Sequence, residues 1–158
     1  MNGSSAQTTF SLRPAALTDL AAIVALRVSS LVEMGILETD TINQPLMDRL
    51  GEEFRSLLSS VQFVSSLAVD GDNIIGCAFG LLSNRLPYPI SSVQGEVAGV
   101  YVVPNMRMRG VASQLVRSIV IELQAREVRE IILRPRRAEA LLYTRAGFRT
   151  AHLMKFSQ

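Results

Sequence analysis

Apolar residues recur along the chain at two spacings, which separate predicted helices from predicted strands. Spacings of three and four residues predict helices at 18–32, 44–58 and 111–123, with a shorter one at 138–145. Short apolar runs predict strands at 10–13, 64–69, 74–82, 93–103, 128–133 and 148–156. The expected order is β-α-α-β-β-β-α-β-α-β, an α/β fold with one mixed central β-sheet flanked by helices.

Turn-forming and helix-capping residues indicate where the predicted helices and strands begin and end. Thr18 is the expected N-cap of the first helix, and Gly35 is expected to end that helix. Residues 70–73 read Asp-Gly-Asp-Asn, which predicts a tight hairpin turn. Gly95 and Gly99 weaken the fourth strand locally, and either can host a β-bulge.

Length and composition are those of one globular domain. The chain has 158 residues, of which 48% are hydrophobic and 19% are charged. We expect residues 10–158 to form a single domain. The preceding segment, 1–9, has no basic start and no apolar run, so we expect a disordered tail rather than a signal peptide.

Two further features bear on location. No apolar run reaches the ~18 residues of a membrane span, so we expect no membrane association. The single cysteine, Cys77, excludes an intrachain disulfide and fits a reducing cytosol. We therefore expect a cytoplasmic protein.

Charge is distributed unevenly along the chain, although the net charge is only +2. Residues 1–106 carry 5 Arg against 10 Asp and Glu, a net −5, and residues 107–158 carry 11 Lys and Arg against 4 Glu, a net +7. A basic half suits an anionic cofactor and an acidic half suits a cationic substrate. An unevenly charged solvated surface explains the pattern equally well. Nucleic-acid binding is not expected, because no recognition motif is present and no aromatic residues are interleaved with the arginines.

The segment 100–112 carries the strongest chemical signal. An apolar, β-branched run stops at Pro104, a loop with two arginines follows, and a helix begins after Gly110. The first-turn amides of a helix lack intrahelical partners and lie at the positive end of its dipole, so a phosphate group docks there. Gly110 allows a ligand to approach the backbone closely, and the small side chain of Ala112 leaves space beside the first helical turn.

The spacing Arg107-x-x-Gly110-x-Ala112 after a strand resembles the coenzyme A pyrophosphate loop of the GNAT acetyltransferase superfamily. The later stretch Leu142-Tyr143-x-x-x-Gly147-Phe148 resembles a second motif of that family. The order and separation of the two motifs also match, and the resemblance covers roughly residues 10–156. It implies the GNAT fold and an acetyltransferase that uses acetyl-CoA as a co-substrate and no metal.

The resemblance also implies where acetyl-CoA lies. The loop amides would bind the pyrophosphate with added charge from Arg107 and Arg109, and the backbone of Val100 and Val102 would pair with the pantetheine arm as an added strand does. The implied cofactor contacts are Val100, Tyr101, Val102, Arg107, Met108, Arg109, Gly110, Val111, Ala112 and Arg136. Arg136 stands where relatives often have asparagine or serine, so a phosphate contact and a solvated helix start both remain open.

Acetyl transfer to an amine needs groups that take up and give protons. Tyr143 occupies the position of the family tyrosine, whose hydroxyl can protonate the departing thiolate; ring packing between helix and sheet is the alternative. Glu96 is the implied base, and an edge glutamate in solvent is the alternative. Strand alternation is expected to place Glu96 on the face that carries Ala98, Val100 and Val102.

Two other reactive side chains are expected to stay out of the chemistry. Cys77 lies mid-strand among apolar residues, where a cysteine is usually inert. His152, the only histidine, is expected to be structural or exposed, and one His with one Cys makes a zinc site unexpected.

In relatives, the region that corresponds to residues 33–40 and the second helix shapes the acceptor pocket. In this chain that region contains a cluster of carboxylates. They would attract a cationic amine, although a solvated helix face is an equal explanation for each of Glu33, Glu38, Asp40, Asp48, Glu52 and Glu53. The expected function is acetyl transfer from acetyl-CoA to a small cationic primary amine by direct attack in a ternary complex. A protein N-terminus or lysine as acceptor, and a non-catalytic acyl-CoA-binding module, are the alternatives. Dimers are common in the family, which leaves a homodimer open.

Overall fold

One mixed sheet forms the centre of the molecule. The computed structural model describes residues 9–86, 93–136 and 139–151. Five strands lie in chain order across the sheet: β1 Ser11–Arg13, β2 Phe63–Asp70, β3 Asn73–Asn84, β4 Val93–Val102 and β5 Glu130–Leu133. Neighbours among β1 to β4 are antiparallel, and β5 runs parallel to β4. The predicted mixed α/β architecture is confirmed.

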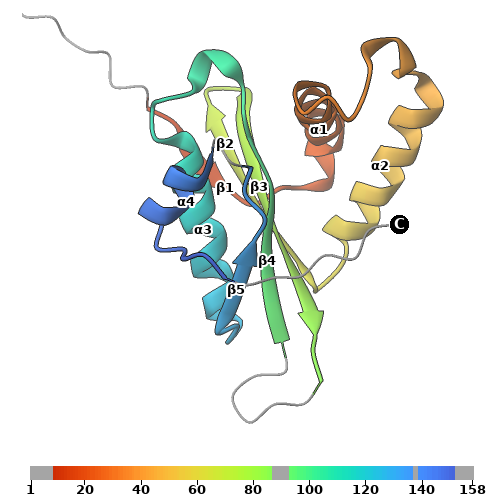
Figure 1. Ribbon diagram of the computed structural model, residues 1–158. Coiled ribbons are helices and arrows are strands. Elements are labelled where there is room, and N and C mark those ends of the chain that lie inside the picture. Colours follow the sequence, from red (N-terminus) through yellow and green to blue (C-terminus); the bar gives the residue numbers. More distant parts are fainter. Residues whose placement is uncertain (1–8, 87–92, 137–138, 152–158) are drawn as a thin grey trace, which may run out of the picture.

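Helices cover both faces of this sheet (Figure 1). On one face lie α1 and α2, which span Leu20–Glu33 and Gln44–Leu58. On the other lies α3, Val111–Ala125, and the short α4, Ala140–Arg145, follows β5. The sheet is therefore buried on two sides, and each face has its own apolar core.

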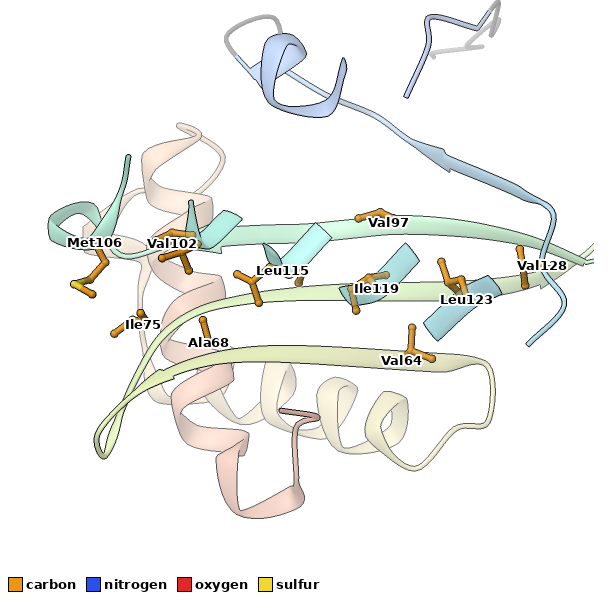
Figure 2. Packing of buried hydrophobic residues seen from close by; sticks show 12 residues of the cluster. Val64, Ala68, Ile75, Val97, Val102, Met106, Leu115, Ile119, Leu123 and Val128 are labelled. Carbon is orange, nitrogen blue, oxygen red and sulfur yellow. The ribbon is translucent and has the colours of Figure 1, made fainter. Parts of the chain in front are cut away.

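The α3 core is aliphatic and tightly packed. Leu115, Ile119 and Leu123 point from α3 onto the sheet, where Val64 and Val97 face them (Figure 2). Gly80 allows this close approach, because a Cβ there would lie 2.4 Å from Val64 Cγ2 and 2.9 Å from Ile119 Cγ2.

The opposite core, under α1 and α2, contains most of the aromatic packing. Phe79 lies at its centre, with ring centroids 5.4 Å from Phe54 and 5.3 Å from Phe63. Ile23 and Leu67 are fully buried beside them.

One predicted cap is wrong. Thr18 lies inside a 3₁₀ turn, Leu17–Asp19, and α1 starts after Asp19. The Asp19 carboxylate accepts from the Ala16 amide at 2.8 Å and binds Arg13 at 2.7 and 2.8 Å. The two oxygens of a carboxylate accept all three bonds and pair with the guanidinium, whereas a threonine hydroxyl has a single, uncharged oxygen.

Residues 148–151, where the last strand is predicted to start, are not in a strand. The rest of that predicted strand, with His152, and residues 1–8 of the predicted tail lie outside the described residues.

The expected bulge is at Gly99. Phe79 of β3 pairs with Ala98, and Cys77 pairs with Tyr101, so two steps along β3 oppose three steps along β4. Gly99 has φ +61°, a left-handed conformation that glycine adopts without strain. Gly95, the other candidate, stays in register opposite Leu82.

This extra residue reverses which face the later side chains occupy. Before the bulge, Val97 packs in the α3 core, and Glu96 pairs with Leu81, which packs on the α1 and α2 side. After it, Tyr101 packs under α1 and Val102 packs in the α3 core. The expectation that Glu96 shares a face with Val100 and Val102 is therefore wrong, because strict alternation does not continue through a bulge.

The bulge makes Gly99 sensitive to substitution. A Cβ at this position would lie 2.7 Å from Phe79 Cδ2 and would also strain a backbone at φ +61°. We expect Gly99→Ala to lower the free energy of unfolding by at least about 2 kcal/mol, measured by urea denaturation.

Gly51→Ala is the matched control. Gly51 lies inside α2 with no atom within 4 Å of its Cβ position, so alanine there should be neutral or stabilise by up to about 1 kcal/mol. Equal stability of the two variants would contradict the role given to the bulge.

Candidate active site

The strands β4 and β5 separate partway along their length. They pair over only four positions, from Gln94 with Glu130 to Val97 with Leu133. Beyond Val97, β4 continues to Val102, and no described strand pairs with that edge (Figure 1). Unpaired peptide groups on a strand edge can bind an extended ligand as an added strand.

A cavity of about 210 Å³ lies beside this open edge. Its walls come from the end of α1, the end of β4, the start of α3, and α4 with the residues before it. The lining residues are Glu33, Val100, Tyr101, Val102, Arg107, Ala112, Arg136, Glu139, Leu142 and Tyr143. The cavity thus brings the predicted strand residues together with Arg107, Ala112, Arg136 and Tyr143.

The loop between β4 and α3 has the form expected of an anion-binding turn. Met106 and Val111 are buried at its two ends, and the residues between them are exposed. Met108 and Gly110 have positive φ, +60° and +80°, and Gly110 is the N-cap of α3. Within the described chain, no side chain caps this helix and no acidic residue lies in its first turn. The first amides of α3 are therefore available to an anion.

Arg107 bonds to the strand and to α1. Its Nε donates to the Val102 carbonyl at 2.9 Å, and its Nη2 donates to both Glu33 carboxylate oxygens at 2.9 and 2.8 Å. The guanidinium also lies 5.5 Å from the centre of the Tyr101 ring, and the Tyr101 hydroxyl donates to Glu33 at 2.8 Å. This network joins the end of α1 to the cofactor loop predicted from the sequence.

The network changes the acidity of its members. Desolvation raises the pKa of Glu33, but hydrogen bonds from Arg107 and Tyr101 outweigh it, so the pKa lies below its usual value. Desolvation and the neighbouring Glu33 both raise the pKa of Tyr101. Glu33 is therefore an anion bound to Arg107, a role that its place in the acidic cluster did not indicate.

Tyr143 is buried in the cavity wall. Its ring packs edge-on against Phe148 with centroids 6.3 Å apart. Desolvation, with a smaller contribution from Glu139, raises the pKa of the Tyr143 hydroxyl to about 12. The hydroxyl is protonated at neutral pH, as a proton donor must be.

Glu96 lies upstream of the bulge and is not among the cavity-lining residues. Its side chain is 26% exposed, and its Oε1 accepts from Nη1 of Arg134 at 2.5 Å. Arg134 directly follows β5, and its pairing with Glu96 leaves no local signal in the sequence, because the two residues lie 38 positions apart.

Arg–Glu pairs surround the site. Arg107 binds Glu33, Arg136 binds Glu139 at 2.9 Å, and Arg134 binds Glu96. Each of these carboxylates has an arginine partner, so this part of the molecule is close to charge-balanced. In contrast, the other carboxylates of the acidic cluster are exposed on α2 and the segment before it: Glu38, Asp40, Asp48, Glu52 and Glu53.

Cys77 is buried, and its thiol donates to the Gly99 carbonyl at 3.6 Å. Burial raises the pKa of this thiol to about 12, so it stays protonated and is a poor nucleophile.

The described residues contain no group of three or more His, Cys, Asp or Glu side chains that could hold a metal ion. Nor does the described chain contain a helix long and apolar enough to cross a membrane.

Comparison with known proteins identifies the fold. Residues 62–150, more than half of the chain, match the acetyltransferase (GNAT) domain family. A predicted acetyltransferase from Clostridium acetobutylicum, solved with acetyl-CoA, is 22% identical with TM-score 0.82, covering 94% of this chain and 96% of that one. Comparison of the sequence with curated proteins found no match.

Two further solved structures share the fold. Glucosamine-6-phosphate N-acetyltransferase from Arabidopsis thaliana is 15% identical with TM-score 0.72, covering 95% of this chain and 98% of its own. AAC(6')-Iy in complex with the bisubstrate analog CoA-S-monomethyl-acetylneamine is 21% identical with TM-score 0.74, covering 95% and 97%.

Proposed function

Because this chain belongs to the GNAT acetyltransferase family, we propose that it transfers an acetyl group from acetyl-CoA to a primary amine in a ternary complex. The observation that carries the proposal is the cavity at the open edge of β4. There the strand edge, the loop before α3 and a buried protonated tyrosine meet. Acetyl-CoA supplies the activated thioester, and the chain supplies its binding, its orientation and the proton transfers.

The open edge and the loop fit the two halves of the cofactor. Peptide groups of residues 98–102 can pair with the pantetheine arm, which is extended and carries amides. The carbonyls of Gly99 and Val102 already accept from Cys77 and Arg107, so the peptide groups between these two residues are the better candidates. The first amides of α3 can bind the pyrophosphate, and exposed Gly110 allows it a close approach. Arg109 lies on the same loop, and Arg107 and Arg136 can exchange their glutamate partners for a phosphate.

Tyr143 is the proposed proton donor to the departing thiolate. It lines the cavity with Val100 and Val102, and its hydroxyl stays protonated. Burial beside the reacting sulfur would strengthen this donation, because little water competes for it.

Glu96 is the proposed base. An alkylammonium has a pKa near ~10.4 and must lose a proton before it attacks. Glu96 lies on the α1 and α2 face of β4, away from the α3 core, and its partly exposed carboxylate can take this proton directly or through a water molecule.

The acceptor is proposed to be a small cationic amine. The exposed carboxylates of α2 and the segment before it support this choice, since they attract positive charge toward this side of the sheet. A protein N-terminus or lysine, and a non-catalytic acyl-CoA-binding module, are the alternatives.

Tyr143→Phe tests the reaction itself. The wild type should release coenzyme A thiol from acetyl-CoA in the presence of a suitable amine. The variant should keep acetyl-CoA affinity but turn over at least about tenfold more slowly, because the leaving thiolate loses its proton donor. Since the hydroxyl has a pKa of about 12, its ionisation should not limit the wild-type rate below about pH 10.

These measurements separate the outcomes clearly. Thiol release that is absent for the wild type across an amine panel would contradict the enzymatic function. Unchanged turnover of Tyr143→Phe would remove only the tyrosine from the mechanism.

Glu96→Gln tests the base. The amide cannot accept the proton, so the pH profile of kcat/KM should lie roughly 10²-fold or more below that of the wild type. Glu122→Gln, an exposed change on α3, is the control and should behave as the wild type. A variant profile that superimposes on that of the wild type would exclude Glu96 as the base.

A further inference from the structure

Glu96 and Arg134 project from neighbouring strands at the point where those strands separate. Glu96 pairs with Ile132 of β5, and Arg134 lies two residues beyond it, just past the last paired position. Ile132, opposite Glu96, lies on the face covered by α1 and α2, and Arg134, just after the strand, reaches the Glu96 carboxylate from there. The carboxylate and the guanidinium are in direct contact, with 2.5 Å between Oε1 and Nη1.

This pair differs from the other two at the site. Arg107 is held in addition by Val102, and Arg136 pairs within its own segment three residues away. Within the part of the chain that the structure describes, no second group holds the Arg134 guanidinium, and its side chain is 70% exposed. The Glu96 side chain is 26% exposed, and an ion pair with an exposed member contributes little to stability, so a ligand that replaces this pair loses little.

We propose that Glu96 and Arg134 together bind the acceptor as a zwitterion, and that the acceptor is an α-amino acid. Its ammonium group lies on the Glu96 carboxylate, and its carboxylate accepts from the planar guanidinium of Arg134. The proposal rests on the acetyltransferase function above and specifies the acceptor as a zwitterion, whose ammonium group is accompanied by a carboxylate.

Charge balance favours this acceptor over a simple amine. An amino acid replaces one ion pair with two, and every charge keeps a partner. A diamine bound at Glu96 would place positive charge beside Arg134, where like charges repel. Because the two side chains touch, the ligand must carry its two charged groups close together. A phosphate at the far end of an amino sugar does not meet this condition.

The transfer then balances without another reactant. The ammonium gives one proton to Glu96, and the resulting amine forms a bond from its nitrogen to the acetyl carbon. As the carbon–sulfur bond breaks, the leaving thiolate takes the Tyr143 proton. The nitrogen then loses a second proton, which restores the Tyr143 hydroxyl through water, and Glu96 releases its proton to solvent. Arg134 holds the amino-acid carboxylate throughout and exchanges no proton.

Matched acceptors test the inference. Thiol release is measured for each of the standard L-amino acids, and for three pairs that differ only by the carboxylate: L-lysine and cadaverine, L-phenylalanine and phenethylamine, L-histidine and histamine. Amides of the best amino acids and glucosamine 6-phosphate complete the panel. We expect the best amino acid to exceed its amide, and its decarboxylated partner where one is tested, by at least tenfold in kcat/KM.

Variants of Arg134 localise the effect. Arg134→Gln should raise KM for the best amino acid at least tenfold and lower the ratio of its kcat/KM to that of its amide at least tenfold, and Arg134→Lys should restore part of the loss. Arg117→Gln, an exposed change on α3, should leave all values unchanged.

Three results would overturn the inference alone: equal use of amino acids and their amides, a preference for glucosamine 6-phosphate, or no effect of Arg134→Gln on the ratio. Absence of thiol release with every acceptor would overturn both the inference and the proposed enzyme.

Discussion

The rest of the site depends on one extra residue in β4, at Gly99. The left-handed backbone there, packed against the Phe79 ring, shifts the strand register by one residue. Tyr101 consequently packs under α1, where its hydroxyl reaches Glu33, and Val102 packs in the α3 core. The β4–β5 pairing ends at Val97, just before the bulge, and the peptide edge beyond it lies beside the cavity. A regular strand would have turned Tyr101 toward α3, and the network at the end of α1 would not form.

The charged side chains around the site form arginine–glutamate ion pairs. Glu33 ends α1, where the helix dipole disfavours a carboxylate, and Arg107 with Tyr101 compensates for this. The same contacts join α1, which lies on the proposed acceptor side, to the loop proposed for the pyrophosphate. Each carboxylate at the site has an arginine partner, so the site carries no large uncompensated charge. An incoming charged ligand therefore replaces an existing ion pair with its own.

Sequence patterns predicted the parts of this arrangement that are local. The helical period of α3, the loop that ends at Gly110 and a bulge at one of two glycines are each encoded within a few neighbouring residues. Contacts between distant segments left no comparable signal. Arg107 and Glu33 are 74 residues apart, and Arg134 and Glu96 are 38 apart, so their pairing depends on the packed sheet and α1. Strand alternation also failed across the bulge, because the extra residue changes the parity of every later position.

The most direct test of this account is a calorimetric titration of the wild-type protein with acetyl-CoA, alongside acetylated pantetheine, which lacks the pyrophosphate and the nucleotide. If the β4 edge and the loop before α3 form one cofactor site, acetyl-CoA binds in the micromolar range and the fragment at least ~100-fold more weakly. No acetyl-CoA binding up to millimolar concentration, or equal affinity for the two ligands, would contradict the account.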